Sequence, residues 1–177
     1  MSRRQPTFPR LWLMTDERQG DDLWNAVRRL PRGTGIIFRH HATPLSQRRQ
    51  LFARLRKIAR RRGLMLFAAG EDGALRGDGS HHRWPGPPRI GTAPAHDIGE
   101  IRAAERSGAI AILLSPVFPT RSHPGAPALG PMRFAALIRT TRLPVIALGG
   151  MDRHRAIRTN GVGAYGWAAI DAWTTER

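Results

Sequence analysis

The sequence predicts an α/β fold, a closed (β/α)8 TIM barrel with a parallel sheet, and three observations carry this prediction. About eight short candidate strands, most of them apolar, recur along the chain, and segments with helical periodicity separate most of them. This alternation is typical of parallel strands that are joined by helices. The clearest run, residues 109–114, is apolar at every position and is bounded by Gly108 and Pro116, as expected of a strand buried on both faces. An open doubly wound sheet is the alternative.

The individual elements follow from these patterns in chain order. Apolar runs bounded by turn-forming or charged residues predict strands over residues 11–14, 35–38, 64–68, 110–114, 143–148 and 164–170. Residues 89–93 are expected to form another strand, and the polar segment of residues 78–82 is a candidate for a short one. Apolar residues at helical spacing predict helices over residues 22–30, 44–62, 98–107, 132–138 and 152–159. Candidate helix caps are Asp21 or Asp22, Thr43 and Asp97, and Gly63 is a natural helix stop.

The segment between residues 70 and 88 lacks helical periodicity. The chain is also short for this type of barrel, since about 200 residues is the usual lower end. We therefore expect a single barrel domain over residues 1–177, with reduced helices around its third to fifth strands. Residues 1–10 are polar and basic and are expected to be flexible.

The amino-acid composition limits the classes of protein to which the chain can belong. The chain is 41% hydrophobic and 24% charged, as is usual for a globular domain. No apolar run approaches the roughly 20 residues of a membrane span, and the basic start leads into no secretory apolar segment. The absence of cysteine excludes disulfides and thiolate metal sites, and it is compatible with the cytoplasmic location that we expect.

The net charge of +16 comes from 28 arginines and a single lysine, Lys57. Such a surplus first suggests nucleic acid as a partner. However, the arginines are spread along the whole chain, and few aromatic residues interleave with them. Small acidic compounds account for the charge equally well, so nucleic-acid binding is the least favoured function.

The loop after residues 110–114 is the strongest candidate for a ligand-binding segment. Its three prolines fix its path, and the side chains of Thr120, Arg121, Ser122 and His123 can donate hydrogen bonds to an anion. In α/β proteins, active and ligand-binding sites lie at the carboxyl ends of the strands, where this loop is expected to lie.

Other strand ends offer further polar groups. Gly149-Gly150 separates a strand from a helix, so the motif can hold a phosphate on backbone N–H groups or simply form a tight turn. Arg39 can bind a phosphate through two hydrogen bonds or form an ion pair with Asp16 or Glu71. Histidines that can transfer protons or bind anions lie at or just beyond the carboxyl ends of four of the expected strands: His40, His41, His81, His82, His96 and His123. No residue is assigned to a metal.

Three segments, Pro116-Val117-Phe118-Pro119-Thr120, Pro124-Gly125-Ala126 and Ile146-Ala147-Leu148-Gly149-Gly150-Met151, closely resemble the signature of the thiamin phosphate synthase/TenI family. The resemblance covers nearly the whole chain in order. It implies a (β/α)8 barrel that uses Mg²⁺ to expel pyrophosphate from hydroxymethylpyrimidine diphosphate. The nitrogen of thiazole phosphate then captures the resulting carbocation.

The resemblance also assigns residues to roles. Arg39 matches the arginine that binds pyrophosphate, while His41 and His123 stand where the family has lysines, and these three are the expected catalytic residues. The implied substrate- and phosphate-binding residues are Arg39, His81, His96, Thr120, Ser122, Gly149, Gly150, Ile170 and Asp171.

Several positions depart from the family pattern. The family glutamine is Ile37, an Asn-Asp pair that supplies a metal carboxylate falls on Ala69-Gly70, and a second metal aspartate belongs to a segment replaced by residues 84–88. Asp171 stands in place of a serine and would repel a phosphate if it pointed inward.

These departures leave three functions open: a divergent synthase, an isomerase similar to the thiazole tautomerases of the family, and a non-catalytic barrel that binds a phosphorylated ligand. A role in thiamin biosynthesis with synthase-type chemistry is the expectation, and coupling activity is expected to be weak or absent. The expected partners are thiazole phosphate and the pyrimidine diphosphate, and self-association into a homo-oligomer is left open.

Overall fold

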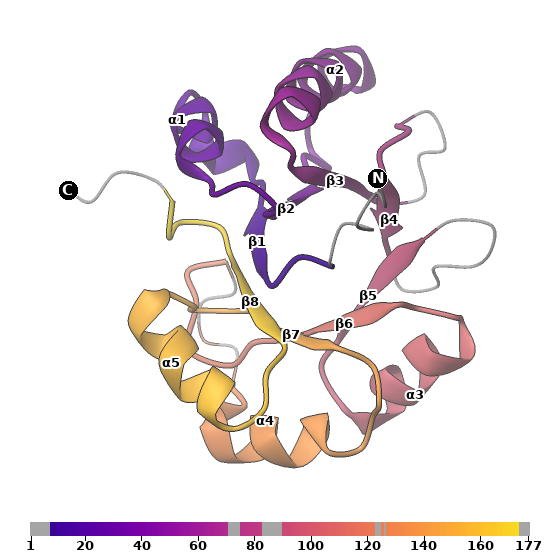
Figure 1. Cartoon of the computed structure of the whole chain (residues 1–177), viewed down its shortest axis with the longest axis vertical. Helices are drawn as coiled ribbons and strands as arrows, with labels where there is room; N and C mark the ends of the chain where they lie inside the picture. The colour runs from indigo at the N-terminus through magenta and orange to yellow at the C-terminus, as the bar shows by residue number, and fades with distance from the viewer. Residues whose placement is uncertain (1–7, 71–74, 83–89, 123–124, 126, 174–177) are drawn as a thin grey trace, which may run out of the picture.

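The chain folds into a closed barrel of eight parallel strands (Figure 1). The computed structural model describes residues 8–70, 75–82, 90–122, 125 and 127–173. The strands are β1 (Leu11–Met14), β2 (Gly35–Phe38), β3 (Met65–Ala69), β4 (Gly79–His81), β5 (Gly91–Ala95), β6 (Ala111–Leu114), β7 (Val145–Ala147) and β8 (Gly166–Ala169). The helices are η1 (Glu17–Gln19), α1 (Asp22–Arg29), α2 (Leu45–Arg62), α3 (Ile98–Arg106), α4 (Gly130–Ile138) and α5 (Arg153–Gly161).

Pairing between the first and last strands closes the barrel. Leu11 lies opposite Trp167, and Leu13 lies opposite Ala169, in the same parallel sense as every other pair of neighbours. The expected closed barrel is therefore confirmed, and the open sheet is excluded.

Alternate residues of each strand point to opposite faces, which separates an inner core from two outer ones. The inner core contains Trp12 and Phe67, whose rings meet edge-on at a centroid distance of 5.2 Å. Leu13, next to Trp12, belongs instead to the outer core beneath α1 and α2. A second outer core lies beneath α3, α4 and α5, around Phe134. Figure 1 shows these two groups of helices on opposite sides of the barrel.

Helix ends follow local chemistry in most places. Asp97 accepts a hydrogen bond from the backbone N–H of Glu100 and so caps α3, as expected. Gly63 ends α2 in the left-handed conformation, with φ at 64°. Thr43 does not cap α2, because Pro44 occupies the cap position, and Asp21 makes no side-chain hydrogen bond at the start of α1.

The flank between β3 and β5 carries no helix in the part of the chain that the structure describes. Residues 70–78 and 82–90 form the two connections, each shorter than the dozen or so residues that a helical crossover needs. The expected reduction of the helices is thus confirmed for the described residues; residues 71–74 and 83–89 lie outside them. The fifth strand was expected at residues 89–93, but it runs from Gly91 to Ala95 because its ladder with β6 continues to the pair Ala95–Leu114.

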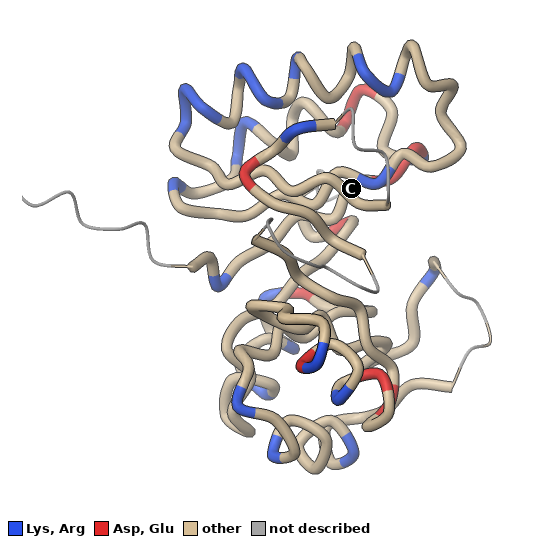
Figure 2. The backbone as a smooth tube through the Cα atoms, turned by 90° about the vertical axis from the view of Figure 1, so that its right-hand side faces the viewer, with Lys and Arg blue, Asp and Glu red and all other residues tan. Residues whose placement is uncertain are grey.

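Positive charge is spread over both groups of helices, as Figure 2 shows. None of the helices in the described residues combines the length and the apolar character that crossing a membrane requires.

Candidate functional site

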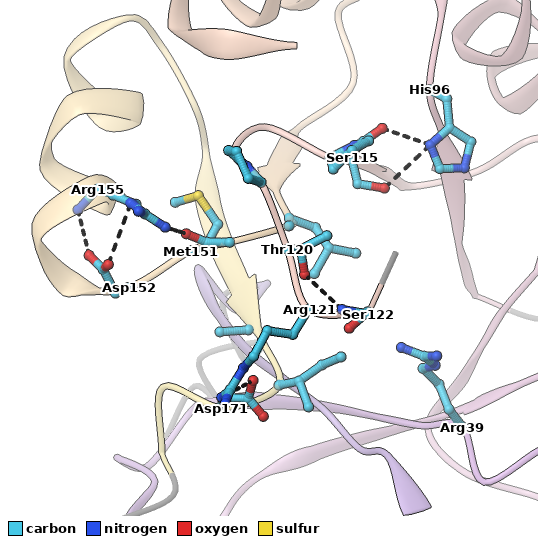
Figure 3. Close-up of a pocket in the computed structure, with 17 residues that line it drawn as sticks. Arg39, His96, Ser115, Thr120, Arg121, Ser122, Met151, Asp152, Arg155 and Asp171 are labelled. Atoms are coloured by element: carbon cyan, nitrogen blue, oxygen red, sulfur yellow. Dashed lines mark hydrogen bonds and ion pairs between the residues drawn. The ribbon is translucent and has the colours of Figure 1, made fainter. Parts of the chain in front are cut away.

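A cavity of about 490 Å³ lies at the carboxyl end of the barrel. The ends of β2, β5 and β8 contribute to its wall, together with the segments that follow β6 and β7 (Figure 3). Of the expected site residues, the cavity wall includes Arg39, His96, Thr120, Ser122, Gly149, Gly150, Ile170 and Asp171. Segments more than 100 residues apart in sequence therefore surround one space.

Gly149 and Gly150 lie where the chain after β7 meets the chain after β6. Both have positive φ, 92° and 60°, a region that other residues rarely adopt. A Cβ atom on Gly149 would lie 2.7 Å from the Cα of Pro116, and one on Gly150 would lie 2.4 Å from the carbonyl oxygen of Pro119. The two loops are also joined by a hydrogen bond of 3.1 Å from the N–H of Phe118 to the carbonyl of Gly149. Close packing of these loops thus demands glycine at both positions.

The start of α5 adds polar groups beside these glycines. Asp152 accepts a hydrogen bond of 2.8 Å from the N–H of Arg155 and so caps the helix. The Arg155 guanidinium donates to the carbonyl of Gly150, lies 3.6 Å from the Asp152 carboxylate, and sits over the ring of Phe118. Arg155 therefore fixes the shape of the loop as well as placing a cation at the cavity wall.

Arg39 reaches the cavity from the end of β2, with 28% of its side chain exposed. Its guanidinium lies 3.7 Å from Asp16, so the ion pair that the sequence left open is present, although at a distance longer than a hydrogen bond. Asp16 instead bonds Arg18 closely, at 2.8 Å, and Arg18 donates to Ser122 across the barrel mouth at 3.2 Å. Burial by itself would raise the pKa of Asp16, but hydrogen bonds from Arg18 and the nearby charge of Arg39 outweigh it and lower that pKa.

Asp171, at the end of β8, does not present an unpaired charge to the cavity. Its carboxylate accepts a hydrogen bond of 2.8 Å from the guanidinium of Arg121, which belongs to the segment after β6. This pair joins two residues that are 50 positions apart in sequence. The repulsion that the sequence suggested for Asp171 is thus offset by a neighbouring cation.

His96 has a defined orientation at the cavity wall. Its Nδ1 lies 2.6 Å from the carbonyl oxygen of Ser115, which can only accept a hydrogen bond. In the neutral ring the proton must therefore be on Nδ1, which leaves Nε2 as the basic nitrogen. His96 is the one expected histidine that the described residues bring to the cavity wall.

The other histidines lie elsewhere in the described structure. His81 is buried on β4 and contacts the hydroxyl of Thr92 at 2.9 Å, and burial together with the charge of Arg39 lowers its pKa to about 3. His81 does not line the cavity, because its ring is enclosed within the barrel. His40 is likewise buried. Its ring stacks on Phe38, and its Nδ1 lies 2.9 Å from the hydroxyl of Thr15.

His41 follows β2 but does not line the cavity. Its ring lies against Gly70, where an added Cβ would be 3.3 Å away. Burial and the charges of Arg48 and Arg39 lower its pKa, so the ring is neutral at pH 7. His123 lies outside the described residues.

Some residues of the cavity were not selected from the sequence as site residues. Arg155 and Asp152 line the wall because α5 begins directly after Gly149-Gly150, and the position of an arginine in the first turn of that helix was the available signal. Arg121 was recognised only as one of several donors in its loop. Its partner, Asp171, could not be identified because the contact joins distant segments.

Carboxylates in the described residues do not form a metal site. No group of three or more histidine, aspartate or glutamate side chains that could hold a metal is present among them. The aspartates that line the cavity, Asp152 and Asp171, each face an arginine. Among the described residues, therefore, no side-chain cluster could hold a metal without a ligand, and both cavity aspartates are already paired with cations.

Comparison with known proteins gives a consistent result. The family model described as thiamine monophosphate synthase matches residues 86–173. A thiamine biosynthesis bifunctional protein of Symbiobacterium thermophilum is 33% identical over 152 residues, which cover 77% of this chain and 32% of that protein. The thiamine-phosphate synthase of Pyrococcus furiosus is 24% identical over 177 residues, which cover 92% of this chain and 86% of that protein.

The solved structure of a thiamine phosphate pyrophosphorylase from Pyrococcus furiosus has the same fold, with a TM-score of 0.80 at 22% identity. The superposed region covers 94% of this chain and 88% of the Pyrococcus furiosus chain. Four curated relatives that are 33–38% identical match over only 32–42% of their own length. Taken with the barrel and the loops after β6 and β7, these matches confirm that the chain belongs to the thiamine monophosphate synthase/TenI family.

Proposed function

We propose that this chain acts in thiamine biosynthesis, with a cavity that binds thiazole phosphate and hydroxymethylpyrimidine diphosphate and couples them. One observation carries the proposal: a single cavity joins Arg39 on one side to the hydroxyls of Thr120 and Ser122 and to Gly149-Gly150 on the other. The names of the relatives, thiamine-phosphate synthases, agree with it.

The phosphate of the thiazole is proposed to bind between Gly149-Gly150 and the end of β8. Backbone N–H groups at the start of a helix attract anions, and α5 begins three residues after Gly150. Thr120 and Ser122 add hydroxyl donors from the opposite loop. Ile170 and Asp171 would complete this subsite through their backbone.

The diphosphate is proposed to bind on the side of Arg39. Departure of pyrophosphate requires positive charge close to its oxygens. Arg39 is permanently charged, and its long ion pair with Asp16 leaves its N–H donors available for a ligand. An imidazolium role for His41 is disfavoured by its lowered pKa in the ligand-free protein, and the roles of His81 and His123 stay predictions.

A requirement for Mg²⁺ also stays a prediction. Both aspartates of the cavity wall, Asp152 and Asp171, are paired with arginines, and two further carboxylates of the segment after β3, Glu71 and Asp72, lie outside the described residues. When bound, Mg²⁺ would neutralise charge on the diphosphate. Action in the cytoplasm and self-association into a homo-oligomer are likewise predictions.

A tautomerase-like isomerase is the second candidate, and the orientation of His96 favours it. The contact with the carbonyl of Ser115 leaves the Nε2 of His96 free to accept a proton. Such a reaction needs proton transfer at a thiazole ring and no diphosphate, so it would not depend on Arg39.

One experiment separates the two functions. Purified protein is incubated with both precursors between pH 6 and 9, with Mg²⁺ or with a chelator, and thiamine phosphate is measured by fluorescence after oxidation. Calorimetry with thiazole phosphate alone measures binding at the Gly149-Gly150 side. Formation of thiamine phosphate that Arg39→Ala lowers by about 100-fold supports coupling. Binding of thiazole phosphate without coupling rejects the synthase proposal, and the absence of binding at millimolar ligand rejects both functions.

A further inference from the structure

The ion pair between Arg121 and Asp171 joins two segments of the cavity wall. Arg121 lies after β6 and Asp171 lies at the end of β8, and both belong to the cavity wall (Figure 3). Their side chains remain 80% and 43% exposed, although Nη2 and Oδ2 are 2.8 Å apart.

Stability does not explain this pair. Ion pairs between exposed side chains contribute little to folding, since solvent screens them and two long side chains must be ordered. The consequence of the pair is local, because it determines the charge that the cavity presents to an anion. Asp171 alone would repel a phosphate held near Gly149-Gly150, whereas Arg121 alone would attract it but would be free to point into solvent.

We infer that Arg121 and Asp171 act together as one phosphate-binding element, in which Asp171 holds Arg121 at the cavity and Arg121 binds the anion. This inference rests on the proposed function, because it assigns to the phosphate subsite a cation beyond its backbone N–H groups. A guanidinium carries five N–H donors in a planar fork. The bond to Asp171 uses one of them, so others remain for phosphate oxygens.

The inference has a measurable signature in a double-mutant cycle. Arg121→Ala removes the cation and exposes the charge of Asp171, so affinity should fall by roughly 30-fold or more. Asp171→Asn keeps the cation but loses both its orientation and the repulsive charge of Asp171. Because these two effects oppose each other, the affinity should stay within about threefold of wild type. The double variant loses only the cation and should be weakened by less than about tenfold. Arg121 therefore matters most when Asp171 is present.

Calorimetric titration at pH 7.5 and fixed ionic strength tests this, with thiazole phosphate and inorganic phosphate as separate probes. Arg102→Ala is the matched control, since Arg102 is exposed, does not line the cavity and changes the net charge equally. Circular dichroism checks that each variant is folded.

The expected result is the cycle above with an unchanged affinity for Arg102→Ala. Equal effects of Arg121→Ala with and without Asp171 would overturn the inference. An affinity increase of tenfold or more in Asp171→Asn would also overturn it, because the pair would then be an obstacle that the anion has to break. If Arg121→Ala and Asp171→Asn interact in the binding of inorganic phosphate but not of thiazole phosphate, the result would support the phosphate-binding element and reject the proposed substrate. Failure of folded wild-type protein to bind either probe would overturn both.

Discussion

Acidification should destabilise this barrel through His81, whose replacement by asparagine removes the effect. The His81 side chain is enclosed at the end of β4, with 8% of the residue exposed, and lies beside Thr92. Burial, together with the positive charge of Arg39, lowers its pKa from 6.5 to about 3. Folding therefore favours the neutral ring, and protonation must be suppressed in the folded state.

The magnitude follows from this difference in pKa. Above pH 6.5 the ring is neutral in both states, and stability does not depend on its titration. Below pH 6.5 the unfolded chain binds one more proton, so the free energy of unfolding falls by about 1.4 kcal/mol per pH unit until the pH approaches 3. Between pH 7.5 and pH 5 the loss from His81 is about 2 kcal/mol. His40 and His41 have lowered pKa values too and contribute in the same direction.

Urea unfolding of the wild type and of His81→Asn at pH 7.5, 6 and 5 measures the effect. Asparagine keeps a polar group near Thr92 but cannot titrate in this range. The variant should lose about 2 kcal/mol less than the wild type between pH 7.5 and pH 5. His154→Asn, at an exposed position of α5, is the control and should follow the wild type. Parallel pH profiles for wild type and His81→Asn would refute the reasoning.

Three further predictions concern the site and its supports. Arg39→Ala should lower coupling by about 100-fold while the affinity for thiazole phosphate in calorimetry is unchanged, and Arg39→Lys should be intermediate because it cannot form two parallel bonds; coupling within threefold of wild type would contradict this. Gly150→Ala should cost about 2 kcal/mol in urea unfolding without any ligand, since its Cβ would overlap the carbonyl of Pro119 at positive φ; an unchanged midpoint would show that the loop relaxes. Asp16→Asn should lower stability at pH 7 by about 1 kcal/mol, and because the pKa of Asp16 is lowered, the difference from wild type should shrink as pH falls towards its folded pKa; a difference that does not shrink on acidification would contradict the ion-pair explanation.

Local sequence determined the barrel and the segments that carry the site. Apolar runs and helical periodicity are properties of neighbouring residues, so they predicted most of the eight strands. The lack of helical periodicity after residue 70 likewise predicted that the described residues between β3 and β5 carry no helix. Glycines and prolines restrict their own backbone, so Gly63 and the loop after β6 were recognised without tertiary information.

Only the tertiary structure decided which polar side chains meet. His40, whose φ is 43°, is buried, and His41 is exposed, although the two are adjacent and chemically identical in sequence. The sequence identified Arg121 as a hydrogen-bond donor and Asp171 as a charge that would repel a phosphate. Their contact joins residues 50 positions apart and depends on how β6 and β8 are placed around the barrel. The charge that a cavity presents depends on distances between such residues, and distances of this kind arise only when the barrel has closed.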